Sequence, residues 1–361
     1  MANTQVATNS SLNILRTQEK LIGYMAEREN PFANFIGSGM ENAIQRLTDL
    51  EKKRGDTVKV HLGTKLTGAG ITGDNTLEGN EEALSWYNDS VIIDQLRHAV
   101  RLDGQMTEQR SAISLRADAG ERLGIWSREV LTEMLVFYLS GARGVRTGHI
   151  LPANWTGHAG NALQAPDANH ILYAGAAGTK AGMAGSDKMT PALLDTAVKK
   201  IKLLINTSAA MRPIKSKGKN YYLCLMPAEH VFDLRQNATW QNAQQYANVR
   251  GDDNPIFSGA DGLWNGLIIH EMPEGVLFND YGGAGNVVAA RTMIMGAQAL
   301  GIAYGNAGGT DAAEGRWKYI EKDNFDYFNQ CGFAMATIMG IKKLRFNNAD
   351  YGCFAVDASY S

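Results

Sequence analysis

The sequence predicts an α+β protein in which helices and strands occupy different stretches of the chain and a long hairpin protrudes. Apolar residues recur every three or four positions across 107–141, which predicts a long helix. Apolar and polar residues alternate over Thr57–Leu62, which predicts a strand. Further apolar runs of strand length follow in the C-terminal half.

The composition indicates a globular chain whose surface carries little charge. The 361 residues include 35 Lys and Arg against 37 Asp and Glu, so the net charge is −2, and 44% are hydrophobic. A near-neutral balance argues against a dedicated nucleic-acid-binding protein, which usually carries a basic domain. Charged residues make up 20%, below the usual ~25%, and 39 residues are glycine. Such a surface is typical of one that a partner covers.

Targeting signals are not recognisable in the sequence. Met1–Ser11 lacks the basic-then-apolar pattern of a signal peptide, and no run of 18 apolar residues occurs, so no membrane association is expected. The cysteines are Cys224, Cys331 and Cys353, an odd number without a CxxC pair. They predict reduced thiols in a cytosolic setting.

Residues 1–56 read as an arm. Apolar residues between Leu12 and Met25 predict a short amphipathic helix that Pro31 ends, and the apolar but glycine-broken segment Phe32–Gly39 follows. The arm has too few apolar residues to fold alone, so we expect it to pack on another part of the protein.

Residues 57–102 predict a long β-hairpin. Thr57–Leu62 is the outgoing strand, and Val91–Leu96 with Ala99–Leu102 supplies the return. The glycine-rich tip Gly68–Gly79 lies between them, and 68–89 contains five acids and no base. A hairpin this long with little core of its own needs a partner surface.

Helices and loops alternate after the hairpin. Gly141 is a natural end for the 107–141 helix, and the Gly-rich insertion 142–189 is expected to be a loop. Thr190 and Pro191 begin a second helix over 190–205. The apolar segment Tyr221–Met226 predicts a buried strand, and a helix follows over Ala228–Arg235. The strands expected later in the chain are Leu267–His270, Phe333–Ile341 and Lys342–Phe346, and Arg291–Leu300 is expected to be a strand followed by a turn.

Catalytic and metal-binding patterns are weak. His149, His158 and His170 lie in the Gly-rich insertion without the spacing of a zinc site, so loop histidines are the favoured interpretation. Cys224 and His230 resemble a thiol–imidazole pair, but a cysteine in an apolar strand is usually inert packing. Gly282–Gly285 lacks the strand and helix that a dinucleotide loop requires. The sequence therefore predicts no cofactor, metal or catalytic site.

Charge is distributed unevenly along the chain. The hairpin tip is acidic, and the stretch from Thr196 to Lys219 contains bases and no acid. Three interpretations remain open for the bases: a solvated helix face and loop, a docking site for the acidic tip of a neighbouring subunit, or weak contact with DNA phosphates. The candidate contact residues are Asp74, Glu78, Glu81 and Glu82 in the tip and Lys199, Lys200, Lys202, Arg212, Lys215, Lys217 and Lys219 in the basic stretch.

Several segments, in this order, closely resemble the major capsid proteins of tailed bacteriophages, and most of all their N4-type branch. The resemblance covers roughly residues 50–346. The segments that carry it are Gly55–Val60, Leu66–Leu84 (Leu-Thr-Gly-Ala-Gly-Ile-Thr-Gly-Asp-Asn-Thr-Leu-Glu-Gly-Asn-Glu-Glu-Ala-Leu), Asp94–Leu102, Tyr138–Arg143, Ala159–Leu163, Asp252–Phe257 and Gly340–Phe346.

The resemblance implies an HK97-type capsid fold. Its parts would be an N-terminal arm (1–56), an E-loop hairpin (57–104), a peripheral domain (105–219) with a spine helix (107–141) and the Gly-rich insertion (142–189), an axial domain (220–317), a return to the peripheral domain (318–350) and a C-terminal tail (351–361). Some relatives cross-link a hairpin lysine to an asparagine of a neighbour, and Lys65 is the hairpin lysine here.

The resemblance also implies the function. The chain would be a structural, non-enzymatic subunit that self-assembles into pentamers and hexamers of an icosahedral phage head in the bacterial host cytoplasm. Its partners would be its own copies, portal, scaffolding and decoration proteins, and packaged double-stranded DNA held by weak, non-specific contact. Two alternatives stay open: an encapsulin-like shell protein of a cellular nanocompartment, and an α+β enzyme with an unrecognised site.

Overall fold

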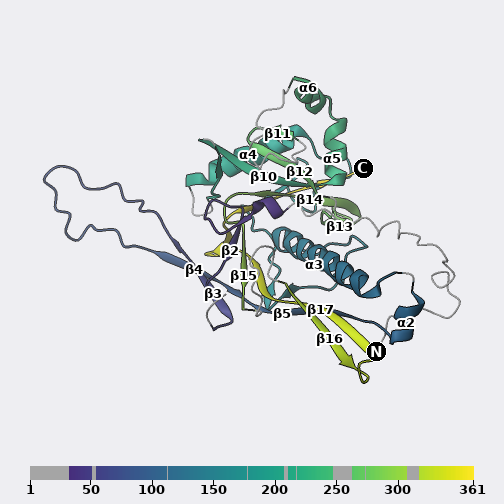
Figure 1. The fold of residues 1–361 in the computed structure, drawn as a ribbon. Coiled ribbons are helices and arrows are strands. Elements are labelled where there is room, and N and C mark those ends of the chain that lie inside the picture. The colour runs from purple at the N-terminus through teal and green to yellow at the C-terminus, as the bar shows by residue number, and fades with distance from the viewer. Residues whose placement is uncertain are drawn as a thin grey trace.

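A computed structural model shows two large β-sheets with a long helix between them (Figure 1). The structure describes residues 32–50, 54–111, 113–176, 178–206, 210–216, 218–246, 262–272, 274–306 and 317–361. The amphipathic helix expected between Leu12 and Met25 and the Asp252–Phe257 segment lie outside these residues. Helix α3 (Leu115–Ser140) shares one hydrophobic core with strands of both sheets, so the two sheets and the helix form one packed unit.

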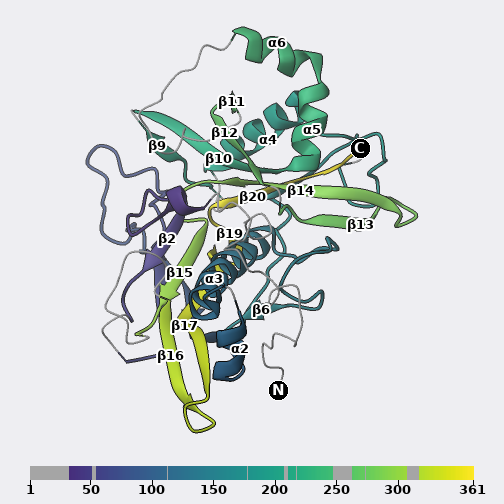
Figure 2. The same ribbon diagram turned by 45° about the vertical axis from the view of Figure 1, so that its right-hand side comes forward.

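An eight-stranded sheet forms one layer (Figure 2). Strand β20 (Cys353–Ser359) is completely buried and pairs with β14 (Val287–Met295) on one side and β8 (Ile171–Tyr173) on the other. The expectation of a C-terminal tail over 351–361 is therefore wrong, because this segment is an interior strand. The remaining strands are β9 (Ile214–Ser216), β10 (Lys219–Pro227), β11 (Gly262–Trp264), β12 (Leu267–Met272) and β13 (Leu277–Tyr281).

Helices cover the face of this sheet that is turned away from α3 (Figure 2). Helix α4 (Pro191–Leu203) begins as predicted, with the Thr190 hydroxyl accepting the Leu193 N–H and proline at the first helical position. Helix α5 (Ala228–Gln236) is confirmed, and α6 (Ala238–Tyr246) follows it. A 3-10 turn, η2 (Leu204–Asn206), extends α4.

A six-stranded sheet forms the other layer, and its longest strand is β17 (Gln330–Lys343). The sequence predicts two closing strands, Phe333–Ile341 and Lys342–Phe346. Strand β17 contains all of the first and continues into the second as far as Lys343. A short pair, β18 (Arg345–Phe346) and β19 (Ala349–Asp350), follows it. The other strands of the sheet are β1 (Ile36–Gly37), β2 (Ile44–Leu47), β5 (Asp94–Arg101), β15 (Leu300–Tyr304) and β16 (Lys318–Phe325).

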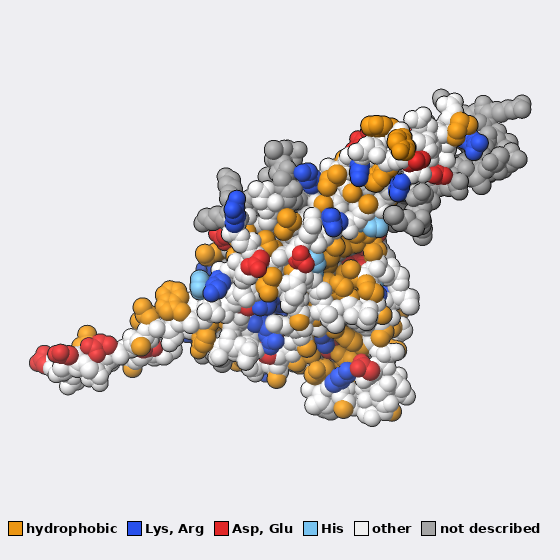
Figure 3. Space-filling model, turned by 90° about the horizontal axis from the view of Figure 1, so that it is seen from below, with side chains coloured by type: hydrophobic (Ala, Val, Ile, Leu, Met, Phe, Trp, Pro, Cys, Tyr) orange, Lys and Arg blue, Asp and Glu red, His pale blue; other side chains and the backbone are white. Residues whose placement is uncertain are grey.

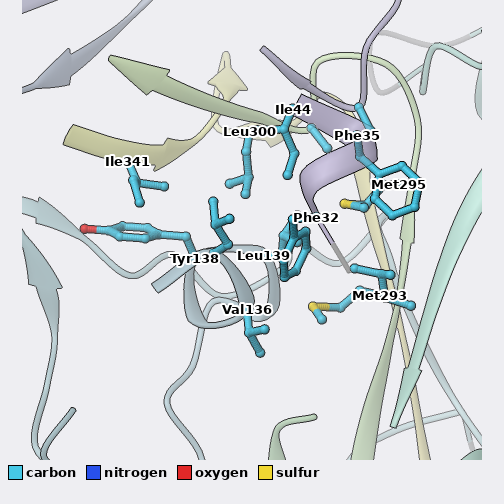
Figure 4. Packing of buried hydrophobic residues seen from close by; sticks show 14 of the residues in the cluster. Phe32, Phe35, Ile44, Val136, Tyr138, Leu139, Met293, Met295, Leu300 and Ile341 are labelled. Atoms are coloured by element: carbon cyan, nitrogen blue, oxygen red, sulfur yellow. The ribbon is translucent and has the colours of Figure 1, made fainter. Parts of the chain in front are cut away.

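The described part of the arm packs into the core of its own chain (Figure 4). Phe32 precedes the 3-10 turn η1 (Ala33–Phe35) and Phe35 ends it, and both side chains are buried beside Leu139 and Met295. Strand β2 pairs in parallel with β15, so it is an integral strand of the six-stranded sheet. The arm thus obtains its hydrophobic partners from residues far along the same chain.

The long helix expected over 107–141 is two helices. Helix α2 (Gln105–Arg110) ends at Ser111, whose hydroxyl donates to the Ile113 carbonyl at 2.9 Å, and α3 begins after Ser114. Serine side chains that bond to the nearby backbone compete with helix continuation, which explains the break. The end of α3 is confirmed, because Gly141 adopts φ 68° there.

The outgoing strand of the hairpin is confirmed, whereas its return strand lies earlier in the chain than expected and its tip is longer. Strand β3 (Thr57–Gly63) pairs with β4 (Trp86–Ile92), with Thr57 opposite Ile92 and Gly63 opposite Trp86. The expected return through 94–102 is wrong, because β5 leaves the hairpin and pairs with β17. Residues 64–85 form a long loop that projects from the body (Figure 1).

Sheet membership also crosses the domain boundaries expected from the sequence. The eight-stranded sheet includes β8 and β9, which precede residue 220, and α4 packs on this sheet rather than beside α3. Strand β15 lies within 220–317 but belongs to the six-stranded sheet. The described residues of the Gly-rich segment 142–189 are mainly loop, as expected, with three short strands: β6 (Gly157–His158), β7 (Asn161–Ala162) and β8.

Candidate assembly surfaces

The hairpin tip has its own internal order, which depends on Glu82. Its carboxylate accepts the backbone N–H of Thr67 at 2.8 Å and of Gly68 at 2.6 Å, and these bonds lower the pKa of Glu82. Glu81 likewise accepts the Gly79 N–H at 2.7 Å. These two acids, expected to contact a neighbouring subunit, therefore hold the loop itself in shape.

Asp74 and Glu78 are the acids at the outer part of the tip, and both are exposed. Figure 3 shows the acidic side chains gathered at the far end of the projection. The projection points away from the body, so within one chain the acidic tip and the basic stretch are not brought together. A contact between them requires a second copy.

Two members of the basic stretch are used within the chain. The Lys200 ammonium donates to the Ile171 carbonyl at 2.7 Å and lies 5.7 Å from the Phe354 ring centre; burial lowers its pKa. Arg212 pairs with Glu41 and donates to Gln298 at 3.3 Å. The remaining described bases, Lys199, Lys202, Lys215 and Lys219, are exposed, and Lys217 lies outside the described residues.

Two adjoining hollows lie on this side of the molecule, and Lys202 is the exposed base of the basic stretch that lines one of them. The larger, about 520 Å³, lies between the base of the hairpin and residues 210–213 with Ile205, and has Lys65, Tyr87 and Arg212 in its walls. The smaller, about 480 Å³, is lined in part by Lys202, and the two hollows share Ile205 and Pro213. This side of the molecule therefore combines concave surface with positive charge.

Large apolar side chains are exposed on both projections of the molecule. On the hairpin they are Leu66, Leu77, Leu84 and Trp86. At the turn between β16 and β17, Tyr327 is 99% exposed and Phe328 is 70% exposed. The backbone of Asp326, Tyr327 and Phe328 has positive φ at all three positions, a conformation that is costly for residues other than glycine. Sequence reasoning missed this aromatic turn, since no periodic pattern marks it.

The weak catalytic patterns have structural roles in this fold. Burial raises the pKa of the Cys224 thiol to about 12, so it is not a thiolate nucleophile near neutral pH. His230 is bonded instead to the Thr292 hydroxyl (2.8 Å) and the Ala358 carbonyl (3.1 Å). Gly282–Gly285 forms the turn between β13 and β14.

The three histidines of the Gly-rich segment are in separate environments. The His158 Nε2 lies 3.4 Å from the Asp94 carbonyl, and His170 pairs with Asp167 at 2.8 Å. His149 lies instead beside two glutamates, Glu133 and Glu274.

Of the helices that the structure describes, none has the length and apolar character needed to cross a bilayer.

Comparisons with known proteins agree with this architecture. The model of the family described as phage capsid protein matches residues 5–361. The chain is 29% identical over 360 residues to the major capsid protein of Pseudomonas phage KPP25, with 91% of each chain covered.

Solved structures show the same fold. The capsid of Ralstonia phage GP4 is 34% identical, has a TM-score of 0.85, and is matched over 100% of this chain and 99% of that one. The capsid of cyanophage Pam1 is 22% identical with a TM-score of 0.75 over the same shares. These matches confirm the α+β, HK97-type fold, while the N4-type branch stays a prediction. With a family model that spans nearly the whole sequence, the chain belongs to the phage capsid protein family.

Proposed function

We propose that this chain is the major capsid subunit of a tailed-phage head, and that it self-assembles into the pentamers and hexamers of an icosahedral shell. The observation that carries the proposal is the 57–92 hairpin. It extends away from the body and exposes leucine and tryptophan side chains along its length. A projection without its own core is explained when it lies across neighbouring copies.

Assembly in this proposal depends on many modest contacts rather than on one large interface. Each copy would contribute its hairpin to one neighbour and receive the hairpin of another. In a closed shell, such repeated contacts add up through avidity. A net charge of −2 suits this design, because identical subunits must approach one another closely.

The acidic tip would dock beside the exposed bases of a neighbouring subunit. Asp74 and Glu78 are exposed acids of the outer tip, and Lys199, Lys202, Lys215 and Lys219 are exposed bases, of which Lys202 lines the smaller hollow. Charge complementarity of this kind mainly sets orientation and association rate. Glu81 and Glu82 would then act by keeping the loop in its docking shape.

The test is assembly of purified protein followed by electron microscopy. Asp74→Lys with Glu78→Lys should reduce shell formation strongly, while the melting temperature of the unassembled subunit stays unchanged. Adding Lys215→Glu and Lys219→Glu to the same chain should restore shells, because the charges are exchanged rather than lost. Normal assembly of the tip variant, or no rescue by the exchanged charges, would refute the docking contact but not the capsid role.

The remaining parts of the proposal concern partners and location. We expect weak, non-specific contact with packaged double-stranded DNA, association with portal, scaffolding and decoration proteins, and assembly in the host cytoplasm. We propose a structural rather than a catalytic role. Nucleic acid inside purified shells would favour the phage head, whereas an enzyme cargo would favour the encapsulin-like alternative. Absence of shells under all conditions and of the chain from virions would refute the capsid role.

Lys65 also belongs to this proposal. It lies in the wall of the larger hollow at the base of the hairpin. If it cross-links neighbouring subunits, mature shells boiled in detergent should show a ladder of covalent oligomers, and Lys65→Arg should remove that ladder. A single band from wild-type shells would exclude the cross-link.

A further inference from the structure

We propose that Glu133, His149 and Glu274 bind one divalent metal ion of the zinc and manganese class. The residues come from three separate segments: α3, the loop that follows it, and the turn between β12 and β13. One ligand atom of each lies within 4.8 Å of the others. The inference goes beyond the capsid role and does not depend on it.

Glu133 is held in one orientation inside the protein. Its two carboxylate oxygens accept the backbone N–H groups of Ile150 (2.8 Å) and Leu151 (2.9 Å), and the residue is fully buried. Two N–H donors stabilise an ionised carboxylate. Each oxygen retains lone-pair capacity for a further bond. This arrangement resembles the outer-shell support that orients metal ligands in proteins.

His149 is equally enclosed and faces the same point. Its side chain is 2% exposed, and its Nδ1 lies 3.3 Å from the Glu133 Oε1. The ring packs edge-on against Phe137, with 5.0 Å between centroids. The Nε2 is also buried and has no hydrogen-bond partner among the described residues. A buried imidazole with unused capacity beside a fixed carboxylate is characteristic of a ligand rather than of a surface loop histidine.

The donor set indicates the class of metal. Imidazole nitrogen with carboxylate oxygens suits zinc and manganese, whereas calcium and magnesium prefer oxygen alone. Zinc–ligand bonds of about 2.1 Å in a tetrahedron place neighbouring ligand atoms about 3.4 Å apart. The Nδ1–Oε1 distance of 3.3 Å already has this value, and a shift of about an ångström would bring the third ligand into range.

Electrostatics favours a cation at this point. Glu274 is 7% exposed, so two carboxylates share a buried space. A divalent ion would neutralise both acids and tie α3 to the two connecting segments.

The test uses the full chain, purified and dialysed against Zn²⁺ or Mn²⁺ and then against metal-free buffer. Elemental analysis should find close to one ion per chain, and either metal should raise the melting temperature by about 3 °C or more. Manganese bound to a mixed nitrogen and oxygen site should also give an altered electron paramagnetic resonance spectrum. These measurements on the wild-type protein need no variant.

Variants then locate the ion. His149→Gln and Glu274→Gln should each lose the bound metal and the thermal response. The matched controls are His158→Gln, in the same loop, and Glu271→Gln, in the adjacent strand β12; both should keep one ion per chain. Less than a tenth of an ion per wild-type chain for both metals, or equal responses in all four variants, would overturn the proposal.

Discussion

Arg291 and Asp357 form an ion pair inside the protein, between β14 and β20. Both guanidinium–carboxylate contacts are 2.7 Å, and the Tyr281 hydroxyl donates to the same carboxylate at 2.7 Å. Arg291 also donates to the Ser140 carbonyl at 2.6 Å, at the end of α3. The pair therefore links β14 to β20 and supplies a hydrogen-bond donor to the last turn of α3. Each buried charge is compensated by the other.

Removing one charge of this pair tests its role. Asp357→Asn should lower the free energy of unfolding by about 3–5 kcal/mol, because Arg291 would remain charged and buried. Urea unfolding of the unassembled subunit measures this difference. The control is Asp323→Asn, whose side chain is 51% exposed and 3.5 Å from Arg116; it should change stability by less than about 1 kcal/mol. Similar losses in both variants would contradict the argument.

His230 is expected to make the stability of the subunit depend on pH. Burial lowers its pKa below the ordinary 6.5, so the folded protein holds it neutral while the unfolded chain is free to bind a proton. Stability from this group is complete above about pH 6.5 and falls as the pH drops toward the folded-state value. Hydrogen bonds lower the pKa of Asp167 below the ordinary 3.8, so the stability that this carboxylate contributes is lost only as the pH falls below about that value.

Melting curves between pH 7.5 and 5 check this expectation. Wild-type melting temperature should fall across the window, and His230→Gln should flatten the curve, although it lowers stability at pH 7.5 because the site is tightly packed. His61→Gln, at an exposed position of β3, should leave the pH dependence as in the wild type. An unchanged slope in the His230 variant would rule out this histidine as the cause.

At the scale of elements, local sequence signals predicted the helices well but did not predict which distant strands pair with each other. Helices α4 and α5 were predictable because Thr190, Pro191 and the apolar spacing act within a few residues. Strand β20 was missed because Asp357 interrupts its apolar run, and only Arg291 explains that residue. The chain divides into β4 and β5 because β4 pairs with β3 and β5 pairs with β17. Strand β17 lies more than two hundred residues after β5, so no local pattern marks the division.

The candidate surfaces show the same limit. The acidic character of the tip and the basic stretch could be read directly from the sequence. The sequence could not show that Glu82 bonds to its own loop or that Lys200 and Arg212 bond within their own chain, because their partners are set by the fold. The cluster around His149 combines three distant segments, and no spacing rule joins them.

Two glycines, Gly124 within α3 and Gly141 directly after it, offer a matched comparison. At Gly141 a Cβ atom would lie 2.0 Å from the Gln164 carbonyl oxygen, and φ is 68°. Gly141→Ala should therefore destabilise the subunit by more than about 1–2 kcal/mol. Gly124 has open space around it inside the helix, so Gly124→Ala should stabilise by about 0.5–1 kcal/mol. Thermal unfolding of both variants should give shifts of opposite sign; shifts of one sign would refute this account.

At the scale of the whole molecule, a rigid body carries extended projections. Helix α3 shares its core with both sheets. Residues 64–85, in contrast, belong to no strand and therefore pair with neither sheet. Stability and assembly should therefore be separable properties of the chain. A change in the projection should affect the contact between copies and not the fold of one copy.

Shortening the hairpin tests this separation. Replacing residues 66–84 by a two-residue Asn-Gly turn should leave the melting temperature of the unassembled subunit within about 2 °C of the wild type, because this loop buries little surface. The same variant should form no shells in electron micrographs. Shells of normal size from the shortened chain would show that the hairpin does not connect subunits.

The pairing of distant segments also has a kinetic consequence. Ile44 lies opposite Leu300, Arg101 opposite Gly332, and Ile171 opposite Ala355, so large loops must close before either sheet gains its pairing energy. Chains with such high contact order typically fold in about milliseconds to seconds. During that interval unpaired strand edges are open to other chains. We therefore expect the yield of native subunit to fall as the concentration of refolding chains rises, and to recover when a chaperone isolates each one.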